Sequence, residues 1–288
     1  MSGSQREREF TGMQPIRIGV VRYLNTAPLN FGLEKLRGLE LVPSVPAGIA
    51  EMIQSVNVDL GLASVIDAAR SRTSGVPLTL VPAGMIGCDG PTLTVRLFSK
   101  VPLEKVSVIH ADIDSHTSVV LCQVVMHGRT GATPRVVPLD TSGSGDAAHG
   151  HEAVLLIGDK VVVRAPSERE YPHQLDLGEA WKQMTGLPFV YAMWMCRSAD
   201  AGSPQVATAA ALLDRQLLHN LTRLDSIVGV RSAEHGWPRE LAAKYLGELL
   251  RYRVGDAERA AVARFLAEAF KLGLIPSADV SWIDDPAA

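Results

Sequence analysis

Polar side chains and glycines follow several predicted strands, where a small ligand could reach them. Asn25 lies in the segment RYLNTAP, just after one apolar strand and just before a predicted helix. Its amide can donate and accept hydrogen bonds at once, and the helix start offers free backbone N–H groups; an N-cap role is the alternative. In the segment GCDGPTLT, Gly90 and Pro91 form a turn that lets the backbone approach a ligand closely. Thr94 follows early in a strand, where threonine is also an ordinary residue.

Two further segments suit a negatively charged ligand. Ser115, Thr117 and Ser118 open a predicted helix, where backbone N–H groups and the helix dipole favour an anion such as a carboxylate. Plain capping of the helix is the alternative. In the segment LLIGD, Gly158 permits close approach of a ligand, and Asp159 either binds that ligand or caps the next helix. By residue chemistry alone, the sequence predicts a binding site for a small anion.

Motifs for metals, nucleotides and activated nucleophiles are missing from the sequence. The eight histidines show no HxxxH or HExxH spacing, and the three cysteines form no CxxC pair. No Walker, GxGxxG or GxSxG segment occurs. We therefore predict neither a metal nor a cofactor. His116, beside the candidate anion site, is either a base or a surface or capping residue.

The elements that must position these residues alternate along the chain. Short β-branched apolar runs predict strands at 16–21, 58–64, 78–87, 92–99, 106–111, 135–139, 153–159 and 188–197. Amphipathic patterns and caps predict helices at 28–36, 46–55, 65–70, 117–127, 177–184, 204–223, 238–250 and 256–272. Alternating strands and helices favour an α/β fold with parallel-rich sheets.

The order of these elements predicts two lobes with a central cleft. Residues 15–99 and 192–288 form one discontinuous lobe, and residues 100–191 form the second as an insertion. Two hinge strands, TVRLFSK and FVYAMWM, carry the chain out and back. Ligands in such folds bind outside the carboxyl ends of the strands, which here means the cleft. Residues 1–14 are polar and charged and are predicted to be a disordered N-terminus.

Composition narrows the class of protein. The chain has 288 residues, 47% hydrophobic and 20% charged, with a net charge of −3 and no clustered basic run. Nucleic-acid binding is therefore not expected. The N-terminus lacks the apolar stretch of a secretory signal, and no apolar run is long enough to cross a membrane. Together with sparse cysteines, this predicts a cytoplasmic protein. The oligomeric state stays open, with a homodimer among the options.

Five segments carry a resemblance to a known family when they are taken together and in order. VRYLNTAPL, GCDGPTLTVRLFSKVPLE, SHTSVVL, AVLLIGD and DLGEAWKQMTGLPFVYAMW resemble the menaquinone biosynthesis family of the futalosine route and cover nearly the whole chain. The resemblance implies a type II periplasmic-binding-protein-like fold. It also implies a cytoplasmic carbon–oxygen lyase that removes water from chorismate to form 3-[(1-carboxyvinyl)oxy]benzoate. A sister enzyme of this fold acts on cyclic dehypoxanthine futalosine and typically carries a histidine where LLIGD has Gly158.

The resemblance also assigns roles to individual residues. Asn25 matches the active-site asparagine of the family, and Thr94 stands at a position that is usually serine, so both are expected to be catalytic. The expected substrate-binding residues are Ser64, Gly90, Pro91, Thr117, Ser118, Gly158 and Asp159. Asp67 stands roughly where the family has glutamate, which is a departure in one wall of the pocket.

Neither Asn25 nor Thr94 titrates near neutral pH, which leaves these two candidates without a good base. We therefore expect the enolpyruvyl carboxylate of chorismate itself to take the ring proton, in a substrate-assisted dehydration. Two other classes compete with an enzyme. A solute-binding protein of a transporter would have a signal peptide or a lipoprotein cysteine, and a ligand-sensing regulator would have an output module.

Overall fold

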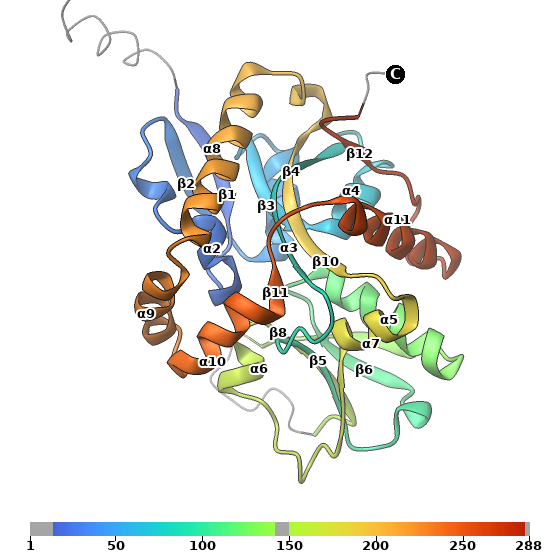
Figure 1. Cartoon of the computed structure of the whole chain (residues 1–288). Helices are drawn as coiled ribbons and strands as arrows, with labels where there is room; N and C mark the ends of the chain where they lie inside the picture. Colours follow the sequence, from blue (N-terminus) through green and yellow to red (C-terminus); the bar gives the residue numbers. More distant parts are fainter. Residues whose placement is uncertain (1–13, 142–149, 286–288) are drawn as a thin grey trace, which may run out of the picture.

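The computed structural model describes residues 14–141 and 150–285, and it forms two sheets with helices packed around them (Figure 1). The larger sheet has the strand order β11-β4-β10-β3-β1-β2, with β12 paired to β4, and the smaller has the order β7-β6-β8-β5-β9. Most of the segment predicted to be a disordered N-terminus, residues 1–13, lies outside the described residues. The α/β class predicted from the sequence is confirmed.

The strands have the following bounds. The larger sheet contains β1 (Ile16–Val20), β2 (Leu39–Pro43), β3 (Leu60–Ser64), β4 (Leu78–Cys88), β10 (Phe189–Arg197), β11 (Leu250–Arg251) and β12 (Ser281–Trp282). The smaller contains β5 (Val95–Ser99), β6 (Val108–Asp112), β7 (Arg135–Leu139), β8 (Ala153–Ile157) and β9 (His173–Asp176). Strand β1 runs parallel to β2 and β3, and β6 runs parallel to β7 and β8.

The larger sheet is buried on both faces by helices. These are α2 (Ala27–Asn30), α3 (Pro46–Gln54), α4 (Val65–Ser71), α8 (Pro204–Leu221), α9 (Leu224–Glu234), α10 (Arg239–Lys244) and α11 (Asp256–Lys271). The helices α5 (His116–Thr130), α6 (Lys160–Val163) and α7 (Leu177–Thr185) belong to the smaller sheet's part of the chain. Burial on both faces explains why β1, β3 and β10 read as continuous apolar runs.

Several predicted helices end or change where backbone geometry intervenes. The helix predicted over 28–36 stops at Asn30, and Gly32 nearby has a left-handed φ of 84°. The helix predicted over 238–250 is α10 followed by a π-helical turn, η5 (Tyr245–Leu249), and strand β11. Helices α6 and α9 and the strands β2, β9 and β12 were not predicted.

The chain crosses between the two sheets at different segments from those predicted. Strand β5 pairs with β8 and β9 from Val95 to Ser99, and β10 pairs with β3 and β4 from Phe189 on. The crossings are therefore residues 89–94 and the stretch from α7 to β10. Sheet membership moves Val95–Ser99 into the smaller lobe and 189–191 into the larger one. The other lobe boundaries stay a proposal.

One carboxylate holds the first crossing in place. Asp176, at the end of β9, accepts hydrogen bonds from the backbone N–H groups of Thr92 (2.9 Å) and Leu93 (2.7 Å). It also caps α7 by accepting from Gly178 and Glu179, both at 3.1 Å. Leu93 has a left-handed φ of 73°, a strained conformation that these bonds maintain. Asp176 thereby links the crossing loop to the helix that leads back.

We expect Asp176→Ala to lower the free energy of unfolding by about 3 kcal/mol, because buried N–H groups would lose their acceptor and α7 its cap. Denaturant unfolding followed by circular dichroism measures this. The control is Asp89→Ala in the same crossing, whose carboxylate meets Lys182 at the surface; it should cost less than about 1 kcal/mol. Equal losses in the two variants would contradict the assigned role.

Candidate active site

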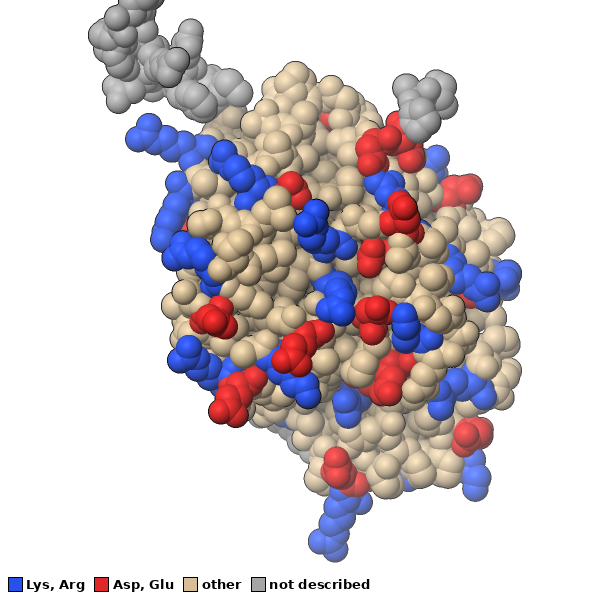
Figure 2. Space-filling view, viewed as in Figure 1, with Lys and Arg blue, Asp and Glu red and all other residues tan. Residues whose placement is uncertain are grey.

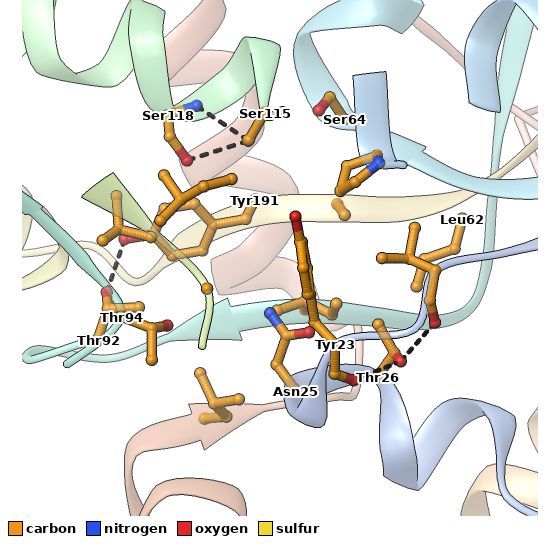
Figure 3. Close-up of a pocket in the computed structure, with 18 of the residues that line it drawn as sticks. Tyr23, Asn25, Thr26, Leu62, Ser64, Thr92, Thr94, Ser115, Ser118 and Tyr191 are labelled. Carbon is orange, nitrogen blue, oxygen red and sulfur yellow. Dashed lines mark hydrogen bonds between the residues drawn. The ribbon is translucent and has the colours of Figure 1, made fainter. Parts of the chain in front are cut away.

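A cavity lies between the two sheets, with about 560 Å³ of empty volume that is partly open to solvent. Its polar lining residues come from both lobes. Figure 3 labels Tyr23, Asn25, Thr26, Ser64, Thr92, Thr94, Ser115, Ser118 and Tyr191, and Tyr245 also lines the cavity. The remaining lining residues are apolar or glycine. No Lys, Arg, His, Asp or Glu is among the described residues that line the cavity. Hydroxyl groups and one amide therefore dominate its chemistry.

Six of the residues predicted from the sequence line this cavity together. They are Asn25, Ser64, Thr94, Ser115, Ser118 and Gly158. They come from segments up to 133 residues apart, since Asn25 follows β1 and Gly158 follows β8 (158 − 25 = 133). The ends of these strands thus meet at the cleft, which is where ligands bind in α/β folds.

Asn25 is held by a short 3-10 turn, η1 (Leu24–Thr26), directly after β1. The Thr26 hydroxyl fixes this turn by donating to the carbonyls of Val21 (2.7 Å) and Tyr23 (2.8 Å). The N-cap interpretation of Asn25 is wrong, because the N-caps of η1 and α2 are Tyr23 and Thr26. The side-chain oxygen of Asn25 is buried without a hydrogen-bond partner among the described residues. It is an acceptor left open on the cavity wall.

Thr94 and Thr92 each meet a tyrosine that the sequence did not single out. The Thr94 Oγ1 atom lies 2.5 Å from the Tyr245 hydroxyl, and the Thr92 Oγ1 atom lies 2.6 Å from that of Tyr191. Burial raises the pKa of both tyrosines, and for Tyr245 the hydrogen bond with Thr94 offsets only part of this. Both tyrosines therefore stay neutral phenols.

The start of α5 combines capping with a place on the cavity wall. Ser115 is the N-cap, and its hydroxyl accepts from the backbone N–H of Ser118 at 3.3 Å. The two hydroxyls also lie 3.0 Å apart (Figure 3). The capping alternative is thus correct for Ser115, while both residues still face the cavity. A helix start with hydroxyl groups is a suitable position for a carboxylate.

Four residues predicted to touch the substrate are not among those lining the cavity. Gly90 is a buried turn residue with a φ of 129°, and Pro91 is exposed. Thr117 is fully buried, and its hydroxyl accepts from the backbone N–H of Ile66 at 3.3 Å. It joins α5 to α4 instead of facing the cleft.

Asp159, the fourth of these residues, makes its contacts with the other lobe. Its carboxylate accepts from the backbone N–H of Leu24 at 3.3 Å and the indole Nε1 of Trp237 at 3.0 Å. The imidazole Nδ1 of His235 also lies 2.8 Å away. Because all three groups belong to the larger lobe, Asp159 is a contact between lobes.

Tyr23 is a further lining residue that the sequence did not indicate. Its hydroxyl donates to Asp114 in the smaller lobe at 3.0 Å, and burial raises its pKa. Gly158 adopts a left-handed φ of 65°, and a Cβ there would lie 3.5 Å from the Tyr23 ring. The close approach predicted at Gly158 is thus made by a protein ring. Only the residue pattern around Asn25 could have pointed to Tyr23, two positions earlier.

His116 and Asp67 face each other away from the cavity. The His116 Nδ1 atom lies 2.8 Å from a carboxylate oxygen of Asp67, which is itself 5% exposed. Neither residue lines the cavity. Within residues 14–141 and 150–285, no three His, Cys, Asp or Glu side chains are grouped to hold a metal ion. The polar groups available for chemistry are therefore the hydroxyls and the amide.

A model of the family described as menaquinone biosynthesis matches residues 16–271. The chain belongs to this family. A curated member, chorismate dehydratase of Thermus thermophilus, is 30% identical over 278 residues, covering 92% of this chain and 98% of that protein. The match to the family spans both lobes and the whole cavity, so the site lies within the shared part of the chain.

Solved structures show the fold that this family member adopts. A protein from Archaeoglobus fulgidus matches with a TM-score of 0.70 at 16% identity, over 91% of this chain and 98% of that one. The periplasmic aliphatic sulphonate binding protein SsuA from Escherichia coli matches with a TM-score of 0.64 at 13% identity, over 93% and 95%. The predicted periplasmic-binding-protein-like fold is confirmed.

The face of the molecule in Figure 2 carries side chains of both charges. Figure 2 shows Lys and Arg interspersed with Asp and Glu on the face in view. Ion pairs such as Arg231 with Glu234 and Arg259 with Asp284 contribute to this mixing. Among the helices of the described residues, none has both the length and the apolar character needed to cross a bilayer.

Proposed function

We propose that this protein is a chorismate dehydratase, a cytoplasmic hydro-lyase that forms 3-[(1-carboxyvinyl)oxy]benzoate in the futalosine route to menaquinone. The observation that carries the proposal is the cavity between the lobes. Its described lining residues offer an amide and hydroxyls, and none of them is Lys, Arg, His, Asp or Glu. The similarity to chorismate dehydratase of Thermus thermophilus supports the same reaction. Water is the leaving group, so no redox partner is required.

The reaction breaks one C–H bond and one C–O bond of the substrate ring. The proton leaves the ring carbon that carries the enol ether, the electron pair forms the new ring double bond, and the neighbouring hydroxyl departs with a proton as water. The ring becomes aromatic, which favours the product. We assign the proton transfer to the enolpyruvyl carboxylate of the substrate, because the lining residues offer no group that titrates near neutral pH.

The protein's contribution is to position the substrate and exclude water. Asn25 and Thr94 hold the departing hydroxyl or the enolpyruvyl carboxylate, and the open acceptor of Asn25 suits a substrate hydroxyl. The start of α5 at Ser115 and Ser118 receives the ring carboxylate, with Ser64 nearby at the start of α4. Neutral donors on the cavity wall interact more strongly with a dianion once the bound substrate displaces water from the cavity, because less water then screens them.

The test is incubation of the purified chain with chorismate. Aromatisation changes the ultraviolet spectrum, and chromatography identifies the product and the loss of one water. Turnover to 3-[(1-carboxyvinyl)oxy]benzoate is the expected result. Binding of chorismate without turnover would favour a non-catalytic binding protein for small carboxylates, and cleavage of cyclic dehypoxanthine futalosine would favour the sister enzyme.

The geometry at Gly158 favours the dehydratase over that sister enzyme. The sister typically has histidine at this position. Here the residue has a left-handed φ of 65°, which a histidine adopts only with strain, and the Tyr23 ring already occupies the space beside it.

We expect His116→Ala to keep kcat within about twofold of the unaltered enzyme, because His116 faces Asp67 outside the cavity and is not the base. Steady-state turnover of chorismate measures this. Asp67→Asn, which weakens the same pair, is the matched variant and should behave alike. Loss of turnover in His116→Ala with chorismate binding intact would establish a protein base and refute the substrate-assisted step.

A further inference from the structure

A carboxylate of the smaller lobe gathers three groups of the larger lobe at one point. Asp159 precedes α6 and contacts Leu24, His235 and Trp237, as described above. Figure 1 shows α6 lying next to α10, which begins just after Trp237. An ionised carboxylate only accepts hydrogen bonds, so the His235 Nδ1 and Trp237 Nε1 atoms are the donors. We call Asp159, His235 and Trp237 the clasp.

The clasp is continuous with the cavity through stacked rings. The indole of Trp237 lies against the ring of Tyr245, with centroids 4.9 Å apart and planes 20° from parallel. Tyr245 opens the π-helical turn η5 and is 1% exposed, and its hydroxyl reaches Thr94 at 2.5 Å. Such π-helical turns are frequent at functional sites, where they redirect a side chain.

The bond between Tyr245 and Thr94 joins the two lobes. Thr94 belongs with the smaller lobe, because its carbonyl accepts from the backbone N–H of Gly158 at 2.8 Å. Tyr245 belongs with the larger lobe, beside β11, which pairs with β4. The Thr94 hydroxyl therefore meets its phenol partner where the chain crosses from the larger to the smaller lobe.

The direction of this bond decides what Thr94 can do. Either hydroxyl can donate at this distance; because a phenol is a better donor than an aliphatic alcohol, we assign the donor to Tyr245 and the acceptor to Thr94. The proton of Thr94 is then free to point into the cavity that this residue lines. Chained hydroxyls polarise one another, which strengthens Thr94 as a donor to the departing hydroxyl of the substrate.

We propose that Tyr245 is a positioning residue that aims the Thr94 hydroxyl at the leaving group, and that the clasp at Asp159 makes this orientation depend on closure of the lobes. This inference rests on the proposed dehydration of chorismate. It assigns Asp159, expected from the sequence to touch the substrate, a role through Trp237 and Tyr245.

Tyr245→Phe tests the positioning role of Tyr245, because it keeps the ring and the stacking on Trp237 but removes the hydroxyl. We expect kcat to fall about 10- to 100-fold with KM changed by less than about threefold. The matched control is Tyr252→Phe, a buried tyrosine nearby whose hydroxyl has no hydrogen-bond partner within the described residues. It should leave kcat and KM unchanged.

A double-mutant cycle separates positioning from general damage. In a Thr94→Val background, Tyr245→Phe should have no further effect on kcat, because the hydroxyl that it orients is already gone. If the double variant instead lowers kcat by the product of the two separate losses, Tyr245 does not act through Thr94. Should Tyr245→Phe fail to fold, as judged by circular dichroism, Trp237→Phe replaces it, since that change retains an aromatic ring but loses the donor to Asp159.

Asp159→Asn tests whether the clasp makes the orientation of the Thr94 hydroxyl depend on closure of the lobes. We expect kcat/KM to fall about 10-fold, and small-angle scattering with saturating product should show a larger radius of gyration than the unaltered chain. Glu234→Gln, on the neighbouring helix and paired with Arg231 of its own lobe, is the control. An unaltered chain that does not convert chorismate overturns the proposed function and this inference with it. An active chain with an unimpaired Tyr245→Phe overturns the inference alone.

Discussion

Asn25→Ala should lower kcat for chorismate dehydration by about 10²- to 10³-fold, the size of effect seen when one preorganised polar group at a reacting centre is removed. The reason is the side-chain oxygen of Asn25, which is buried on the cavity wall with no partner among the described residues. The turn that holds it is fixed by the Thr26 hydroxyl, so the amide is already in place before substrate arrives. Steady-state kinetics with chorismate measures the loss.

Two variants sharpen this test. Asn25→Asp keeps the shape but adds a negative charge, which repels a dianion, so KM should rise together with the fall in kcat. Asn57→Ala, at an exposed position, should leave both constants unchanged. Near-normal turnover of Asn25→Ala would remove Asn25 from the mechanism.

Thr94→Val should lower kcat by about 10²-fold, because it preserves the volume of the side chain but removes the hydroxyl that meets Tyr245. KM should change less, since the hydroxyl acts on the departing group more than on the bound ground state. Thr94→Ser should restore most of the activity, because it returns the hydroxyl. Full activity of Thr94→Val would refute the role assigned to Thr94.

The control for the Thr94 substitution is a second buried threonine that does not line the cavity. Thr79 in β4 is also buried, and its hydroxyl meets that of Ser198 at 2.8 Å; neither residue is among those that line the cavity. Thr79→Val should lower the unfolding free energy by about 1 kcal/mol, without changing kcat. Loss of kcat in both variants would indicate that activity follows stability and not the Thr94 hydroxyl.

The alternation of strands and helices was predictable from the sequence because it depends on local patterns. Apolar runs such as IRIGV and AVLLI are β-branched and short, and both are strands. The placement of polar residues just after these strands followed as well. Asn25, Thr94, Ser118 and Gly158 therefore emerge at one cavity, because strand ends of α/β sheets meet at the same cleft.

Other features depend on contacts between segments far apart in the sequence. Tyr245 lies 151 residues from Thr94, inside what reads as an ordinary helix, and its role appears only when the π-helical turn directs its hydroxyl across the cleft. Thr117 and Asp159 carry the same side-chain types as binding residues. Packing, however, turns Thr117 toward Ile66 and Asp159 toward Trp237.

The sequence by itself therefore determined the class of fold, the strand ends that supply the site and the neutral polar character of its groups. These properties are local, since hydrophobic periodicity and side-chain chemistry are carried by neighbouring residues. The tertiary structure decided where the chain crosses between sheets, which polar groups face the cavity and which join the lobes. That choice depends on how two independently patterned sheets pack against each other, and no local pattern encodes the distance between Thr94 and Tyr245.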